Sequence, residues 1–157
     1  MKGKAEADDV AACQDTVFGY CTAINEWERL QYILGRIEKK QFVQDRHLES
    51  VAGLTLLSHA EEHARIFERF IVPRQRAYGA NPGEPLSWAR DGSYYDVERQ
   101  TIKSVTFASS NLAEVVTAWG FQFPGGLTMF VLKKTQGKWL IDSLKVASSS
   151  GWEVAHL

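Results

Sequence analysis

Two histidines and a glutamate lie close together in the segment His59–His63, which has the sequence His-Ala-Glu-Glu-His. On a helix this spacing places both imidazoles one turn apart on one face, and His-x-x-Glu-His is the zinc-binding pattern of one group of metalloproteases. The pattern has few fixed positions, and the following chain indicates a sheet where a third ligand on a further helix is expected. We therefore favour a solvated helix face that starts with a capping box at Ser58 and Glu61, and we expect no metal site.

A single carboxylate, Asp142, lies between Leu140 and Leu144 in a segment typical of a strand. If this face of the strand points into a pocket, burial would raise the pKa of Asp142 and suit it to general acid-base catalysis. The opposite face, with Trp139 and Ile141, is equally apolar, so Asp142 could instead point to water or cap a neighbouring backbone. We expect no catalytic residue and retain Asp142 as a pocket candidate.

Other chemistry has no support in the sequence. The chain contains no Gly-x-Ser-x-Gly, no phosphate-binding Gly-x-x-x-x-Gly-Lys and no dinucleotide-binding Gly-x-Gly-x-x-Gly. Cys13 and Cys21 are eight residues apart on one expected helix, so their Cα atoms would be about 12 Å apart, too far for a disulfide. We expect two reduced thiols on the apolar stripe of that helix and no cofactor.

An aromatic and acidic segment, residues 88–98, follows a proline-rich loop. Tyr, Trp and Arg side chains anchor many protein interfaces, and acidic neighbours would speed the approach of a basic partner. The alternative is an edge strand that packs one aromatic face on the core. As a partner-binding surface, the segment would use Trp88, Asp91, Tyr94, Tyr95, Asp96 and Glu98.

Helices are expected in the first half of the chain, over about residues 8–72. Apolar residues recur at steps of three and four from Val10 to Leu34, which predicts a long amphipathic helix with Asp8 and Asp9 as N-cap residues. We expect Gly35 to break it before a charged helical segment at 36–49. A further helix runs from the capping box to Pro73.

A sheet is expected in the second half, over about residues 88–147, after a loop at 73–87. Four apolar segments within 101–147 are separated by turn residues at hairpin spacing, which predicts an antiparallel meander. Because helices precede the strands without interleaving, the predicted class is α+β in a single domain, 1–157. Kinks at Gly120, Gly125 and Gly126 would curve the sheet into a cone, and residues 148–157 form a C-terminal tail.

Composition and charge are those of an ordinary folded protein. The 157 residues are 45% hydrophobic and 24% charged, with a formal net charge of −1, which indicates neither a nucleic-acid partner nor an anionic membrane surface. The N-terminal residues contain no apolar stretch typical of a secretory signal, and no apolar run is long enough to span a membrane. We therefore expect a cytoplasmic protein.

Several segments, spread over roughly residues 15–145, resemble bacterial immunity proteins with the nuclear transport factor 2-like fold. They are Ala23–Glu28, Ile66–Phe70, Gly83–Pro85, Tyr94–Asp96, Phe130–Lys134 and Gly137–Ser143. The resemblance implies a cone with N-terminal helices packed on a curved antiparallel sheet. It also implies a cytoplasmic antitoxin that binds the cognate toxin domain of a contact-dependent, polymorphic or type VI system.

Such a family has no shared catalytic residues, and its toxin contacts vary with the toxin, so the resemblance transfers only the general role. The longer helical region and the tail of this chain could belong to the toxin interface or to a homodimer. One alternative function is a small-molecule hydratase, isomerase or cyclase of the same fold that uses acid-base chemistry in the cone. Another is a dimerisation module without a ligand.

Overall fold

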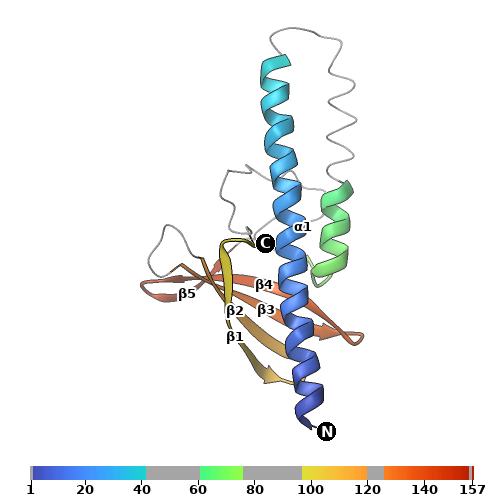
Figure 1. Ribbon diagram of the computed structural model, residues 1–157, viewed down its shortest axis with the longest axis vertical. Helices are drawn as coiled ribbons and strands as arrows, with labels where there is room; N and C mark the ends of the chain where they lie inside the picture. Colours follow the sequence, from blue (N-terminus) through green and yellow to red (C-terminus); the bar gives the residue numbers. More distant parts are fainter. Residues whose placement is uncertain (1, 42–60, 76–96, 120–125, 156) are drawn as a thin grey trace.

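The computed structural model describes residues 2–41, 61–75, 97–119, 126–155 and 157. A long helix, α1 (Lys2–Gln41), and a second helix, described over residues 61–70, pack on one sheet (Figure 1). The strands are β1 (Gln100–Ser109), β2 (Leu112–Trp119), β3 (Leu127–Thr135), β4 (Lys138–Ser148) and β5 (Gly151–Ala155). Their order is β1-β2-β3-β4-β5 and every neighbouring pair is antiparallel, which confirms the predicted α+β class and meander.

Two-residue turns join several neighbouring strands. Gln136 and Gly137 link β3 to β4 with φ angles of 50° and 78°, and positive φ at both positions is typical of the turn whose twist matches a hairpin. Glycine adopts this conformation without steric cost, whereas glutamine rarely does. The β3–β4 connection is therefore tight, and it holds the ends of the two strands together.

The C-terminal segment is part of the sheet, so the predicted tail at 148–157 is wrong. β5 pairs with the second half of β4, from Leu144 opposite Ala155 to Ser148 opposite Gly151. Leu157, just beyond the strand, is buried in the core. A five-residue strand after a run of serines carries too few alternating residues to be distinguished from a polar tail by its pattern.

Helix α1 is longer and more regular than predicted. It begins at Lys2 and continues through Gly35 to Gln41, so both the expected start near residue 8 and the expected break are wrong. One glycine inside a helix costs about 1 kcal/mol relative to alanine, which a long helix can absorb. Asp8 and Asp9 lie inside the helix and do not cap it.

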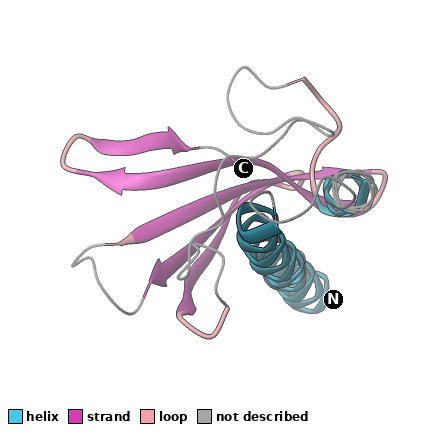
Figure 2. Cartoon of the chain, turned by 90° about the horizontal axis from the view of Figure 1, so that it is seen from above, coloured by secondary structure: helices cyan, strands magenta, loops and turns pink. Residues whose placement is uncertain are grey.

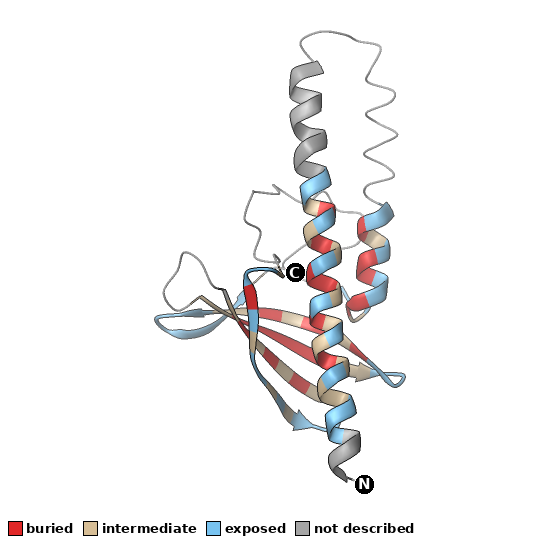
Figure 3. Ribbon diagram, in the orientation of Figure 1, coloured by how far each residue is buried: buried red, intermediate tan, exposed pale blue. Residues whose placement is uncertain are grey.

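The core lies between the two helices and one face of the sheet, with α1 in contact with β1, β2 and β4 (Figure 3). Seen along α1, the strands spread as a twisted fan beside the helix (Figure 2). The buried positions of α1 recur at steps of three and four, as predicted. The central buried side chains are Cys13, Val17, Tyr20, Cys21, Ile24, Trp27, Phe67, Phe70, Phe130, Leu132 and Ile141.

The two helices approach closely at Gly19. A Cβ atom at this position would lie 2.7 Å from Cε1 of Phe70, closer than real Cβ contacts. The ring of Phe70 also packs edge-on against Tyr20, with 6.3 Å between ring centroids. The absence of a side chain at Gly19 is therefore what lets the second helix sit against α1.

The sheet has irregular pairing at three places. The register shifts leave Lys103 and Ala108 as extra residues in β1, and Asp142 as an extra residue in β4. Such bulges bend a strand and increase its twist. Of the glycines expected to kink the sheet, Gly120 and Gly125 lie outside the described residues, and the shifts in the described strands fall on other residue types.

The bulge in β4 decides which side chains face the core. Ser143 pairs with Val131 and Ile141 pairs with Leu132, so Asp142 has no partner residue in β3. Because the bulge adds one residue, Ile141 and Leu144 can both be buried although three positions separate them. The two faces of β4 look equally apolar in the sequence, and the bulge determines which side chains of the strand face the core.

Candidate functional site

Asp142 forms a compact ion-pair network that we call the Asp142 cluster, made of Arg74, Lys133 and Asp142. The Oδ1 atom of Asp142 accepts hydrogen bonds from Arg74 Nε at 3.0 Å and from Lys133 Nζ at 3.1 Å, and Oδ2 accepts one from Arg74 Nη2 at 3.3 Å. Arg74 Nη2 also donates to the backbone oxygen of Asp142 at 3.1 Å. The two-pronged contact matches the fork geometry by which arginine binds a carboxylate.

Three elements bring the Asp142 cluster together. The chain after the second helix joins β4 through a parallel bridge between Ile71 and Ile141, and Val72 donates its N–H to the Ile141 oxygen at 2.9 Å. This bridge places Arg74 next to the β4 bulge, where Asp142 is turned out of the regular ladder. Lys133 reaches the same carboxylate from β3.

The electrostatics of Asp142 differ from the expectation for a pocket acid. Burial raises the pKa of Asp142, but the hydrogen bonds and positive charges of Arg74 and Lys133 outweigh burial, and the net pKa is lowered. Asp142 therefore lacks the raised pKa that a pocket acid would need. Asp142 is an anion at neutral pH that is held in place by two cations.

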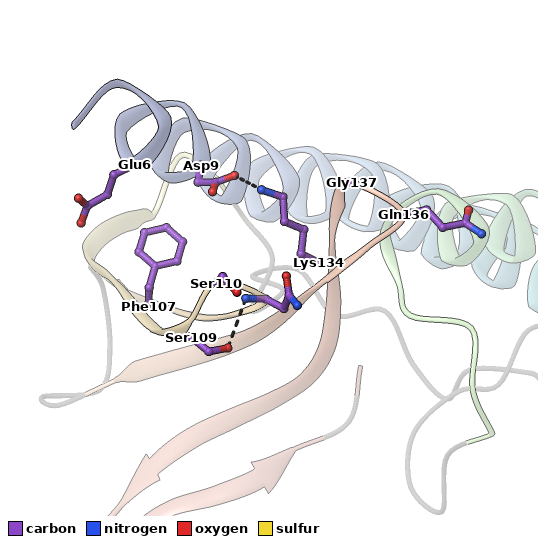
Figure 4. Close-up of a pocket in the computed structure, with 9 residues that line it drawn as sticks. Glu6, Asp9, Phe107, Ser109, Ser110, Lys134, Gln136 and Gly137 are labelled. Atoms are coloured by element: carbon purple, nitrogen blue, oxygen red, sulfur yellow. Dashed lines mark hydrogen bonds and ion pairs between the residues drawn. The ribbon is translucent and has the colours of Figure 1, made fainter. Parts of the chain in front are cut away.

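A second polar site lies where the N-terminal part of α1 crosses the turns of the sheet. This site, the Asp9 groove, has a volume of about 700 Å³ (Figure 4). Its walls come from α1, from the β1–β2 turn and from the β3–β4 turn. The lining residues are Glu6, Asp9, Phe107, Ser109, Ser110, Asn111, Lys134, Gln136 and Gly137.

Asp9 is anchored in this groove by two donors from the sheet. Its Oδ1 atom accepts hydrogen bonds from Lys134 Nζ at 2.6 Å and from Trp139 Nε1 at 2.9 Å. These bonds lower the pKa of Asp9. Lys134 Nζ also lies 5.3 Å from the centre of the Trp139 ring, and its backbone N–H donates to the Asn111 oxygen at 2.9 Å. These contacts join α1 to both turns at the groove.

Asp9 has the residue type and position expected of a helix cap, and its contact with the sheet was not predicted. A signal was present, because Asp9 lies four residues before Cys13 and so falls on the buried stripe of α1. A charged residue on such a stripe needs a partner on the surface against which the helix packs. The identity of that partner, however, depends on the β3–β4 turn.

His63, the last residue of the His-x-x-Glu-His pattern, does not lie on an exposed helix face. His63 is 1% exposed, and its ring packs between Trp27 and Phe67 with centroid separations of 4.7 and 4.5 Å. The prediction of a solvated helix face is wrong at this residue, although Glu62 is exposed and pairs with Arg65. His59 lies outside the described residues. Among the residues that are described, no three His, Cys, Asp or Glu side chains gather to hold a metal ion.

The two cysteines behave as predicted, since both are free, buried and on the core-facing side of α1. Burial raises the pKa of each thiol to about 12, and the charges of Asp9 near Cys13 and Glu28 near Cys21 act in the same direction. Cys21 Sγ lies 4.0 Å from Oε1 of the buried Gln100. Both thiols are protonated at neutral pH and are core side chains.

Most of the predicted partner-binding surface lies outside the described residues. This applies to Trp88, Asp91, Tyr94, Tyr95 and Asp96. Glu98 is described, is exposed, and lies in the turn that precedes β1. The structure therefore places one residue of that surface and leaves the others as predictions.

Comparisons with protein-family models, with curated proteins and with solved structures found no match. In the described part of the chain, no helix is both long and apolar enough to cross a membrane.

Proposed function

We propose that this protein is an immunity protein, which binds and neutralises a cognate bacterial toxin effector in the cytoplasm and performs no chemistry of its own. The proposal starts from the resemblance of the segments at Ala23–Glu28 and Gly137–Ser143 to immunity proteins with the nuclear transport factor 2-like fold. The arrangement of two helices on an antiparallel sheet is compatible with that fold. The finer assignment to a cone of this family is part of the same proposal.

The state of Asp142 argues against the enzyme alternative in which this residue is the acid-base group. A hydratase, isomerase or cyclase working by general acid-base chemistry needs a group whose pKa lies near the working pH. The pKa of Asp142 is lowered, and both carboxylate oxygens accept hydrogen bonds from Arg74 or Lys133. A carboxylate held in this way stabilises the fold and is a poor proton acceptor.

The proposed toxin-binding surface remains the segment at 88–98. The exposed Glu98 supports an acidic component of this surface. An acidic surface would speed association with a basic toxin face, and the effect would weaken as salt screens the charges.

The proposal is tested by purifying the tagged protein from the lysate of its own producer and identifying what co-purifies by mass spectrometry. The account expects a stoichiometric C-terminal toxin domain that arrests growth when expressed alone. Recovery of the protein without a toxin, together with turnover of a small molecule that Asp142→Asn abolishes, would establish the enzyme alternative and refute the proposal.

A further inference from the structure

The Asp9 groove has a polar rim and an aromatic wall. Phe107, near the end of β1, contributes the aromatic ring, and Glu6 and Asp9 project from one face of α1 (Figure 4). Phe107 is supported from behind by Trp139, with 5.7 Å between ring centroids. Glu6 and Asp9 are three residues apart, which makes them neighbours on the helix surface.

The formal charge of this groove is negative. Its lining holds two carboxylates, Glu6 and Asp9, against one ammonium group, Lys134. Lys134 is already paired with Oδ1 of Asp9. No donor among the described residues contacts the other oxygen of Asp9 or the carboxylate of Glu6, so a cation entering the groove finds two carboxylate acceptors.

Neutral acceptors lie on the opposite side. The β1–β2 turn contributes Ser110 and Asn111 to the lining, whereas the side chain of Gln136 in the β3–β4 turn points away from Asp9 and Phe107 (Figure 4). The groove thus has carboxylates on one side, neutral polar residues on the other and an aromatic wall. This combination suits a planar cation that can donate hydrogen bonds in several directions. A guanidinium group has five N–H donors in one plane and stacks on aromatic rings, whereas an ammonium group is a compact point charge.

We propose that the Asp9 groove receives an arginine side chain of the partner protein. This inference rests on the proposed binding function and adds a contact chemistry at a site separate from the segment at 88–98. The guanidinium donates to Glu6 and to the second oxygen of Asp9, and its plane lies against Phe107. The anchoring of Asp9 by Lys134 and Trp139 fixes the position of the acceptor before the arginine arrives.

The test uses N-acetyl-L-arginine methylamide as the probe, titrated into the isotope-labelled full chain and followed by two-dimensional NMR. The expected result is saturable shifts at the Trp139 indole N–H and at the backbone N–H of Ser110 and Gly137. N-acetyl-L-lysine methylamide, with the same charge, is expected to bind more weakly. Equal binding of the two probes, or no saturable shift at these positions, would overturn the proposal.

The variant Glu6→Lys tests the acidic side without removing the Asp9 anchor. We expect it to weaken arginine-probe binding about tenfold, since it replaces an attractive charge by a repulsive one. Glu68→Lys is the matched control, because it makes the same charge change on the exposed side of the second helix. An unchanged affinity in Glu6→Lys, with a thermal midpoint equal to that of the control, would contradict the assignment.

The probe and toxin experiments together show whether the groove assignment or the proposed immunity function is wrong. If the chain neutralises its toxin but does not bind the arginine probe, the groove assignment is wrong and the immunity function stands. If the probe binds as expected, but no toxin co-purifies and the protein turns over a small molecule in a reaction that Asp142→Asn abolishes, the groove is a guanidinium site and the immunity function is wrong. Loss of toxin affinity in Glu6→Lys, with Glu68→Lys unaffected, supports both.

Discussion

Trp139 donates its indole N–H to Oδ1 of Asp9 at 2.9 Å, joining the N-terminal part of α1 to the start of β4 across 130 residues of sequence. Lys134 donates to the same oxygen. The two bonds fix the position of α1 relative to the β3–β4 turn and give the Asp9 groove its shape. The N-terminal part of α1 is therefore attached to the sheet by polar contacts in addition to the apolar core.

Removing this anchor is expected to destabilise the fold. Asp9→Ala leaves the Trp139 N–H and the Lys134 ammonium without their shared acceptor, so the thermal midpoint should fall. Asp9→Asn keeps an acceptor oxygen without the charge and should lower the midpoint less. Asp15→Ala, at an exposed position of the same helix, is the control for helix propensity and charge. Equal midpoints for Asp9→Ala and Asp15→Ala would show that the anchor contributes nothing.

The Asp142 cluster should make stability depend on pH in the acidic range. Because the pKa of Asp142 is below its ordinary value of 3.8, the stabilisation is fully present above that value and is lost as the pH falls below it. Asp142→Asn removes this contribution. Its free energy of unfolding should therefore be lower than that of the wild type at pH 7, with a smaller decrease between pH 6 and pH 3.

The comparison is made by denaturant unfolding at several pH values. Asp9, whose pKa is also lowered, is unchanged in both proteins, so the difference between them reports Asp142. Parallel pH profiles for the wild type and Asp142→Asn would contradict the assigned ion pairs.

The close approach at Gly19 predicts that a small substitution is harmful. Gly19→Ala gains about 1 kcal/mol of helix propensity, but its Cβ atom meets the buried ring of Phe70 at 2.7 Å. Overpacking of this kind costs about 1–3 kcal/mol, so we expect a net loss of about 1 kcal/mol. As a single substitution, Phe70→Leu should lower the free energy of unfolding. In the Gly19→Ala background the same substitution should lower it less. Additive effects in this double-mutant cycle would show that the two positions do not interact.

The burial of Cys13 and Cys21 predicts low thiol reactivity. With each pKa raised to about 12, the thiolate fraction at pH 8 is very small, and the folded structure also blocks access. Alkylation by iodoacetamide should be slow in the native protein and fast in denaturant. Rapid labelling of either cysteine in the native protein would contradict its placement in the core.

The sequence predicted the parts of the fold that follow from local periodicity. The stripe that includes Val17 and Ile24 identified α1, and alternating residues with turn signals identified four strands and their meander order. Long-range contacts were not predictable in the same way. The bulge at Asp142 depends on the register between β3 and β4, and the bridge from Ile71 to Ile141 joins segments with no shared pattern.

The candidate sites show the same division between local and long-range information. Asp142 was identified as a pocket candidate with its orientation left open, and the direction of its pKa shift depends on Arg74, which reaches it from the chain after the second helix. Asp9 has the residue type of a helix cap, but the start of α1 at Lys2 and the contacts with Lys134 and Trp139 show that it joins the helix to the sheet. His63 has the pattern of a metal ligand, yet its environment between Trp27 and Phe67 is that of a core side chain.

Growth rescue is the most direct test of the immunity function. The toxin domain that co-purifies with the protein is expressed in a host that lacks this chain, with and without the wild type and the Asp142→Asn variant, at a temperature at which both are folded. The account predicts arrest by the toxin alone and rescue by either protein, because neutralisation requires binding and no proton transfer by Asp142. Continued arrest in the presence of the folded wild type would contradict the account, as would rescue that Asp142→Asn abolishes while still binding the toxin.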